Sequence, residues 1–218
     1  MKKKVKEILR LLDENYGPLE CYLVHENTWQ LLISTILSAQ CTDDRVNMVT
    51  EKLFKKYTSI EDFAKALPSE LEEDIRQTGF YRNKAKNIIL CCQSLIENFG
   101  GEVPSDIESL TSLAGVGRKT ANVIRGNIYA IPSIVVDTHV KRISRHLGLA
   151  SSEDPVKIEF ELMEVLPREH WIRYNTQVIA HGRKICVARR PRCGECFLSP
   201  YCDTYKKTGN QNPTVLLK

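Results

Sequence analysis

Apolar residues recur along most of the chain at the three- and four-residue spacing that places them on one face of an α-helix. This spacing is typical of amphipathic helices that pack against a core. Three stripes show it most clearly: Val5, Ile8, Leu9, Leu11 and Leu12; Trp29, Leu32, Ile33, Ile36 and Leu37; and Val46, Val49, Leu53 and Phe54. The alternation typical of a β-strand is confined to one short candidate at 134–136. The pattern therefore predicts an all-α protein of about ten helices.

Polar residues at several predicted helix starts carry capping signals. In a capping box, a Ser or Thr side chain accepts the backbone amide three residues on, and a Glu at that position bonds back. Three pairs have this spacing: Thr58 with Glu61, Ser69 with Glu72, and Ser105 with Glu108. Asp154 followed by Pro155 predicts a further start, with the aspartate as N-cap and the proline in the first turn.

The composition of the 218 residues is that of an ordinary globular protein, with 42% hydrophobic and 27% charged residues. This balance excludes disorder as the main state. Glu7, Arg10 and Asp13 interrupt what would be the apolar core of an N-terminal signal peptide, and the apolar runs are too short to cross a bilayer. We therefore expect a soluble, cytoplasmic protein with no membrane association.

The net charge of +4 conceals an uneven distribution. Residues 110–150 carry a net charge of +5 and residues 182–218 a net charge of +6, so the remainder sums to −7. Two basic blocks on an otherwise acidic chain indicate a directed site for a polyanion such as DNA.

The first basic block contains a glycine turn, at Gly115 and Gly117 on either side of Val116. Glycines allow a tight turn and the close approach of an external group. The amides of a helix that begins just after such a turn suit a phosphate oxygen, and the adjacent Arg118 and Lys119 favour DNA backbone binding. The alternative is a plain helix–turn–helix corner with glycines for steric reasons.

Lys119 and Asp137 are the candidate reactive groups. Lys119 falls in the first turn of the predicted helix, where the helix dipole disfavours a cation and so favours the neutral amine of a nucleophile. The alternative is a solvated or phosphate-contacting lysine. Asp137 follows an apolar run and comes just before another predicted helix. It is either the N-cap of that helix or an ionised group in a low-dielectric site, and the two roles are compatible.

Four of the eight cysteines crowd into seventeen residues near the C-terminus, whereas the others are scattered in apolar surroundings. The crowded set is Cys186, Cys193, Cys196 and Cys202. In a reducing compartment such a run predicts a metal site, of zinc or of iron and sulfur. The single CxxC flanked by wider loops favours a [4Fe–4S] cluster. The first loop carries Arg189, Arg190 and Arg192, which would display guanidinium groups to phosphates unless the loop is simply solvated.

Five blocks of sequence, in this order, resemble the endonuclease III family of base-excision DNA glycosylases. They are LLISTILSAQCTDDRVN (31–47), TGFYRNKAKNI (78–88), LAGVGRKTANVI (113–124), VVDTHVKR (135–142) and HGRKICVARRPRCGECFLSPYC (181–202). The resemblance implies a two-domain all-α fold. A six-helix domain at 21–132 would contain the helix–hairpin–helix at about 107–127. Residues 1–20 would join 133–218 in a domain that holds the [4Fe–4S] cluster, with 186–202 as the cluster loop.

The resemblance also implies roles for individual residues. Lys119 would attack C1′ of the sugar and Asp137 would assist, so that base release is followed by a Schiff base and β-elimination 3′ to the lesion. Gln40 would enter the space of the extruded base, and Phe80 would wedge between bases where the family often has leucine, although a core aromatic is the alternative. Other implied DNA contacts are Gly115, Val116, Gly117, Arg118, His139, Arg189 and Arg190. Asp43 would line the base pocket or merely cap a helix beginning at Asp44.

The function predicted in this way is that of a bifunctional DNA glycosylase/AP lyase for damaged, oxidised pyrimidines. Its partner would be double-stranded DNA containing damaged bases or abasic sites, and the chain would act as a monomer on the nucleoid of a prokaryotic cell. One alternative is a monofunctional mismatch or adenine glycosylase on the same scaffold, which usually lacks a lysine at the position of Lys119. The other is a non-catalytic helix–hairpin–helix DNA-binding module with a structural metal.

Overall fold

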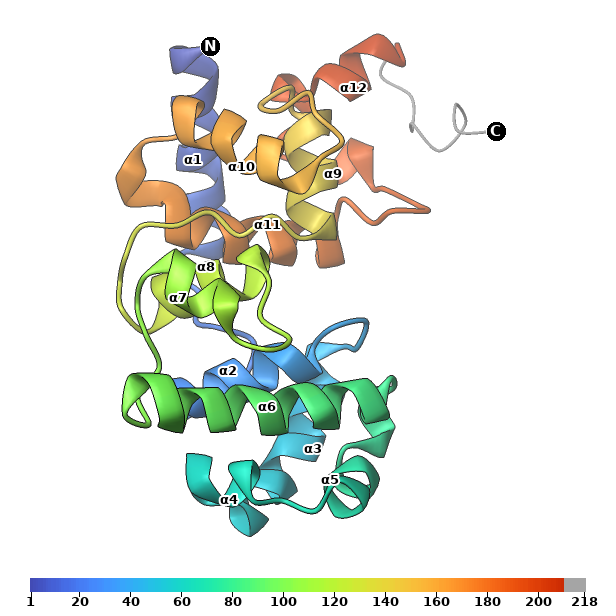
Figure 1. The fold of residues 1–218 in the computed structure, drawn as a ribbon. Coiled ribbons are helices and arrows are strands. Elements are labelled where there is room, and N and C mark those ends of the chain that lie inside the picture. The colour runs from blue at the N-terminus through green and yellow to red at the C-terminus, as the bar shows by residue number, and fades with distance from the viewer. Residues whose placement is uncertain (210–218) are drawn as a thin grey trace. The chain divides into compact units, whose positions relative to one another are not determined.

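The computed structural model describes residues 1–209, and every regular element in this part of the chain is a helix (Figure 1). The all-α prediction is therefore confirmed. No helix among the described residues is long and apolar enough to cross a membrane. The described chain forms two compact units. One consists of Cys21–Ile131, and the other combines Met1–Glu20 with the chain from Pro132 onward.

The unit formed by Cys21–Ile131 is built around two helices. Its elements are α2 (Thr28–Leu37), α3 (Asp43–Lys56), α4 (Ile60–Ala64), α5 (Pro68–Asp74), the 3₁₀ turn η1 (Arg76–Thr78), α6 (Tyr81–Phe99), α7 (Ile107–Ser112) and α8 (Arg118–Asn127). The helix α2 is apolar on nearly all sides, and its residues from Gln30 to Leu37 are buried. A helix with this pattern belongs at the centre of a core. The long helix α6 packs against α2, α4 and α5.

A cluster of aromatic side chains packs inside this core. The ring of Phe63 is fully buried and stacks on Tyr57, with 4.8 Å between ring centroids. Trp29 meets both Phe54 and Phe63 edge-on or tilted, at 5.4 and 5.9 Å. Such pairs add about 0.5–1.5 kcal/mol each to the free energy gained from burial. These contacts pack α3 and α4 against α2.

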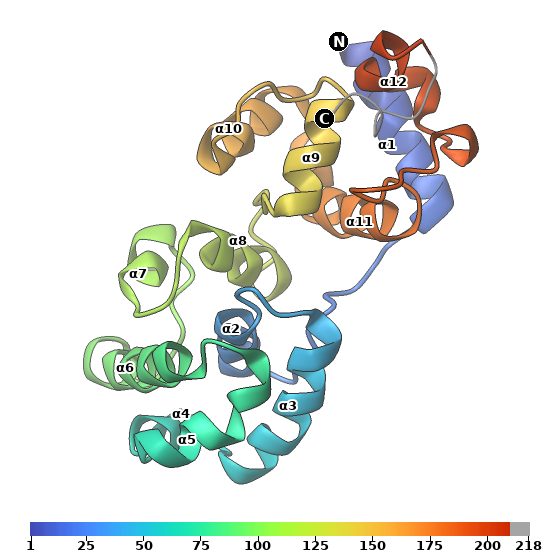
Figure 2. The same ribbon diagram turned by 90° about the vertical axis from the view of Figure 1, so that its right-hand side faces the viewer.

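The second unit joins the N-terminal helix to the last third of the chain. Its elements are α1 (Lys2–Tyr16), α9 (Thr138–His146), α10 (Pro155–Val165), η2 (Arg168–His170), α11 (Trp171–Lys184), η3 (Cys193–Glu195), η4 (Ser199–Tyr201) and α12 (Asp203–Lys207). Figure 2 shows α1 beside α11, and α9 also packs on α11. The predicted stripe of α1 is buried in this core: Val5, Ile8, Leu9 and Leu12.

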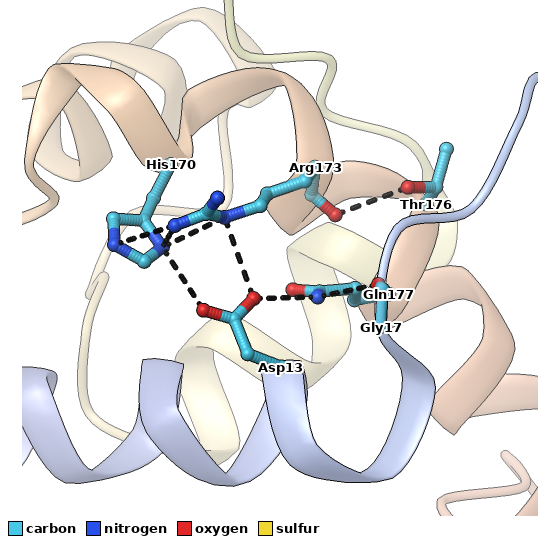
Figure 3. Close-up of polar contacts among 6 residues, drawn as sticks. All are labelled: Asp13, Gly17, His170, Arg173, Thr176 and Gln177. Atoms are coloured by element: carbon cyan, nitrogen blue, oxygen red, sulfur yellow. Dashed lines mark hydrogen bonds and ion pairs between the residues drawn. The ribbon is translucent and has the colours of Figure 1, made fainter.

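A polar network ties the end of α1 to α11 (Figure 3). Gln177 is fully buried, and its Nε2 donates to Asp13 Oδ1 at 2.8 Å and to the Gly17 carbonyl at 3.0 Å. Arg173 pairs with Asp13 at 3.3 Å and donates to the ring of His170. Burial and the neighbouring guanidinium lower the pKa of His170. The network fixes the point at which the chain leaves α1.

Some helices are capped by the residue that the sequence predicts, and others by a neighbouring residue. Asp154 caps α10 by accepting the Lys157 amide at 2.9 Å, as expected. The capping box of α4 is formed by Ser59 with Asp62, one residue after the predicted pair. Asp106 caps α7 instead of the preceding serine.

Two other local predictions are wrong. The helix α5 has Leu67 at its N-cap and Pro68 in its first turn, with no side-chain cap from Ser69. Residues 134–136 are not a strand. Ile134 and Val135 are buried in an extended connection instead, where the side-chain Nδ2 of Asn175 donates to the Val135 carbonyl at 3.0 Å.

Candidate functional site

The glycine turn between α7 and α8 forms a compact helical hairpin. Leu113 is extended after α7, and the Val116 amide donates back to its carbonyl at 3.1 Å. Gly115 has a φ of +77°, and a Cβ at this position would lie 2.9 Å from Asn87 Cβ on α6. Both the left-handed backbone and the close approach require glycine here.

Gly117 has a different environment. It is the N-cap of α8 with an extended backbone, and no side chain caps the amides that follow. A Cβ at Gly117 would meet nothing within 4 Å. The first amides of α8 therefore have no side-chain cap at the positive end of the helix, an arrangement that suits a phosphate oxygen.

Lys119 projects from the first turn of α8 and is exposed, whereas the following Thr120 is buried. Among residues 1–209, no hydrogen bond or ion pair engages the Lys119 ammonium. The side chain is thus available to an external substrate. Arg118, beside it, is partly buried and engaged by a neighbour.

Asp137 is the N-cap of α9, where its Oδ1 accepts the Val140 amide at 2.7 Å. The capping prediction is confirmed. The residue is half-buried, and its Oδ2 accepts no hydrogen bond from the described residues. The cap fixes the orientation of a carboxylate that retains an available oxygen. Two residues further on, in the first turn of α9, His139 packs directly over Gly182 of α11, and its Nδ1 lies 3.4 Å from Arg142 Nη2.

The two predicted DNA-inserting residues share an unusual backbone. Gln40, between α2 and α3, has a φ of +54°, and Phe80, before α6, has a φ of +49°. Left-handed conformations are rare for residues other than glycine and persist only where the surroundings hold them. Both side chains are exposed, Phe80 by 66%, so the alternative of a core aromatic at Phe80 is wrong.

Asp43 does not cap a helix. The helix α3 begins at Asp43 itself, and its N-cap is Thr42, whose side chain accepts the Arg45 amide. The capping alternative for Asp43 is therefore wrong, and its role in a base pocket stays a prediction.

The four crowded cysteines line one cavity in the second unit. Cys186, Cys193, Cys196 and Cys202 surround it together with apolar side chains of α9 and the cysteine loop. All four are free thiols. No three His, Cys, Asp or Glu side chains of the described chain converge tightly enough for a single metal ion, so the fit to a cofactor rests on the shared cavity.

Burial raises the pKa of all four thiols, that of Cys196 to about 11. An anionic sulfur ligand in this setting needs positive charge to stabilise it. Arg142 of α9 lines the cavity and donates to the Cys186 carbonyl at 2.7 Å, and its Nε is buried with no partner among the described residues. An orphaned guanidinium nitrogen beside four thiols fits an anionic iron–sulfur cluster.

Sequence reasoning missed Arg142 and His181 as parts of this centre. His181 is buried, with Nε2 lying 3.4 Å from Cys196 Sγ and Nδ1 lying 3.0 Å from the Tyr16 hydroxyl. Burial lowers its pKa to about 4, which leaves the ring neutral. The only signal was the position of His181 five residues before the first cysteine, since the contacts themselves span different helices.

The arginines of the cysteine loop divide into two kinds. Arg192 is tied back to the Lys184 carbonyl and pairs with Glu195 at 3.4 Å. Arg189 and Arg190 are exposed, and no side chain of residues 1–209 pairs with them. Two of the three predicted arginines are therefore exposed without a partner among the described residues, whereas the exposed Arg192 is held within the loop.

Comparison with known proteins identifies this arrangement. Residues 33–168 match the family model of the HhH-GPD superfamily base excision DNA repair proteins, and residues 186–202 match the iron–sulfur binding domain of endonuclease III. Endonuclease III of Synechocystis is 47% identical over 92% of both chains, and that of Bacillus subtilis is 44% identical over the same shares. The chain belongs to the endonuclease III family. A solved structure of endonuclease III trapped in a covalent intermediate with DNA is 42% identical, covers 96% of this chain and 99% of its own, and superposes with a TM-score of 0.91.

Membership of the endonuclease III family settles the class of activity and the cofactor. The protein is a DNA glycosylase/AP lyase of base excision repair, and its cofactor is a [4Fe–4S] cluster. The predicted fold, enzyme class and cofactor are thus confirmed, and a non-catalytic DNA-binding module is excluded.

Proposed function

We propose that this glycosylase/AP lyase removes oxidised pyrimidines from duplex DNA and nicks the strand 3′ to the resulting abasic site, with Lys119 as nucleophile. The observation that carries the proposal is the exposed Lys119 side chain, which no described residue engages, at the start of α8 directly after the glycine turn.

The reaction begins when the Lys119 amine attacks C1′ of the damaged nucleotide. The C1′–N bond breaks, and its electron pair leaves with the base, which is protonated. The Lys119 nitrogen then loses a proton, and its lone pair forms the C=N bond as the C1′–O4′ bond opens, so that O4′ takes that bond's electron pair and a proton and becomes a hydroxyl. Asp137 stabilises the positive charge that develops on the sugar and helps to deprotonate the amine, through the carboxylate that the α9 cap orients.

Strand cleavage follows from the Schiff base. The iminium group acidifies C2′, which loses a proton, and the C3′–O bond breaks so that the 3′ phosphate leaves. Water hydrolyses the imine and returns the Lys119 amine. The target base reaches this site only when it leaves the stack, at an unstacking cost of a few kcal/mol. Gln40 and Phe80 fill the vacated space and offset part of that cost, and Asp43 lines the base pocket.

The remaining assignments concern DNA and the cluster. The first amides of α8 after Gly117, together with Arg118, His139, Arg189 and Arg190, contact the DNA backbone. Cys186, Cys193, Cys196 and Cys202 hold the [4Fe–4S] cluster. The bound cluster supplies four iron–thiolate bonds that fix residues 186–202, so that the exposed arginines are presented from an ordered loop.

The domain organisation and setting complete the proposal. Residues 21–132 form the helix–hairpin–helix domain, and residues 1–20 with 133–218 form the cluster domain. Apolar cores within the two units support this division. The protein acts as a monomer on the DNA of a prokaryotic cytoplasm.

Borohydride trapping on abasic-site DNA tests the chemistry. We expect the wild-type protein to form a covalent adduct and Lys119→Ala to form none, while both bind the DNA. Lys157, exposed on α10, provides a control, and Lys157→Ala should trap as well as the wild type. Normal trapping by Lys119→Ala would refute the assignment of the nucleophile. Excision from a panel of oxidised, deaminated and mismatched bases tests the substrate class, and release of mismatched thymine or adenine alone would refute it.

A further inference from the structure

Lys84 is a buried cation that the reaction described above does not use. It lies in the first turn of α6 and is only 4% exposed. Its ammonium donates to two main-chain oxygens, the carbonyl of Leu37 at 2.9 Å and the carbonyl of Thr78 at 2.8 Å. No carboxylate in the described chain pairs with it. A buried ammonium is costly unless its donors are satisfied, so these two carbonyls compensate for its desolvation.

Both carbonyls stand at helix ends. Leu37 is the last residue of α2, and Thr78 is the last residue of η1. The carbonyls of a final turn lack partners within their own helix. At the end of α2 a cation also complements the helix dipole, which offsets the unfavourable dipole at the start of α6. The Cys41 amide, which a continuing helix would bond to Leu37, donates to Ser38 at 3.1 Å instead. Lys84 thus satisfies an acceptor that the chain leaves available.

Each of these helix ends leads directly into one of the left-handed residues. Gln40 follows Leu37 by three positions, and Phe80 follows Thr78 by two. The elements concerned all belong to the unit Cys21–Ile131, in which α2 packs on α6 (Figure 1). A single ammonium therefore anchors the starts of both loops whose exposed tips carry Gln40 and Phe80.

We propose that Lys84 is a positioning residue that holds the loops of Gln40 and Phe80 together, in the geometry in which both fill the gap of an extruded base. The inference rests on the proposed function, since that function assigns the two tips to the DNA. Ordering the loops before binding removes an entropic cost from the insertion step. Lys84 should therefore affect the preference for gapped DNA over intact DNA, and affect general DNA affinity little.

The test compares dissociation constants for two duplexes that differ at one position, a stable tetrahydrofuran abasic-site analogue and an intact nucleotide. Lys84→Met should lower the ratio of the two affinities by about 10-fold, as expected when a charge-assisted hydrogen-bond pair is lost. Lys86→Met, on the exposed side of the same helix, removes the same charge and should leave the ratio unchanged. A reduced active fraction scales both constants equally and cancels in the ratio.

A double-mutant cycle separates positioning from general destabilisation. In a Gln40→Ala/Phe80→Ala background, adding Lys84→Met should change the ratio by less than about twofold, because Lys84 acts through those two residues. An equal loss in both backgrounds would overturn the proposal, and so would a Lys84→Met protein that keeps the wild-type ratio.

A second variant of Lys84 and a measurement on the wild-type protein complete the test. If Lys84→Met does not fold, Lys84→Gln carries the test, since its amide can still donate to one carbonyl and should give an intermediate loss. A Lys84→Gln protein with the wild-type ratio would refute the role. A wild-type protein that neither traps abasic DNA nor prefers the analogue would instead defeat the proposed function itself.

Discussion

The same substitution should affect stability at one glycine of the hairpin turn and DNA binding at the other. At Gly115, alanine would have to adopt a φ of +77° and place its Cβ 2.9 Å from Asn87 Cβ. The left-handed backbone costs about 1–2 kcal/mol. The overlap with a neighbouring helix adds about 1–2 kcal/mol, at the lower end of overpacking effects. We expect Gly115→Ala to lower the free energy of unfolding by about 2–4 kcal/mol.

At Gly117, the backbone is extended and a Cβ meets nothing within 4 Å. Alanine lowers the entropy of the unfolded chain, a gain of about 0.4–1 kcal/mol. It is a poorer N-cap than glycine, which offsets that gain. Gly117→Ala should therefore change the free energy of unfolding by less than about 0.5 kcal/mol. It should nevertheless weaken DNA binding about 10-fold, because the methyl group occupies the approach of a phosphate to the α8 amides.

Urea unfolding and duplex binding at one salt concentration measure the two effects separately. The steric reasoning fails if Gly117→Ala destabilises the protein as much as Gly115→Ala. The assignment of Gly117 to the DNA surface fails if Gly117→Ala binds duplex DNA as tightly as the wild type.

Three other outcomes follow from the structure. Alanine at Arg189 or Arg190 should lower the slope of log affinity against log salt by about 0.9 for each lost phosphate contact. The control Lys157→Ala should leave the slope unchanged. If neither arginine variant changes the slope, the loop is not part of the DNA-binding surface. Cys196→Ser should lower the iron content and the broad visible absorption of the purified protein, and full retention of both would exclude this thiol as a ligand. The pKa of His170 in the folded protein lies below its ordinary value, so the neutral ring contributes to the free energy of unfolding. This stabilisation is lost as the pH falls from above 6.5 through the folded-state pKa. Urea unfolding at pH 7.5 and 5.5 should therefore show a smaller pH dependence of stability for His170→Gln than for the wild type. An equal pH dependence in the two proteins would refute this role of His170.

Local sequence signals determined the helices well but not their first residues. The stripe of Val5, Ile8 and Leu12 is buried as its spacing predicts. At α4, however, Thr58 with Glu61 and Ser59 with Asp62 have the same spacing, and only the second pair forms the box. Asp62 also accepts from the Thr58 amide at 2.8 Å and from the Thr58 hydroxyl at 3.0 Å, so its carboxylate bonds both residues before the helix. Spacing alone does not distinguish between two pairs that overlap in this way.

The candidate site also contains some features that the local sequence predicts and others that it does not. The glycine turn, Lys119, the Asp137 cap and the cysteine run are each contained in a few consecutive residues, and could be predicted. The bonds of Lys84 to Leu37 and of Arg142 to Cys186 span more than forty positions and leave no local pattern. A buried lysine in an otherwise ordinary amphipathic helix looks like any solvated lysine until the fold brings two helix ends to it.

The distribution of the two cores along the chain has a consequence for synthesis. The unit Cys21–Ile131 is continuous, so all its core residues have been made once the ribosome passes α8. The apolar stripe of α1 has no such neighbours, because its partner α11 ends only at Lys184. The helix α1 must therefore wait for α11, which is made after the whole of the unit Cys21–Ile131. Domains generally fold as units from the N-terminus during synthesis. We therefore expect the unit Cys21–Ile131 to fold before the other unit, and Val5, Ile8 and Leu12 to stay unburied until α11 emerges.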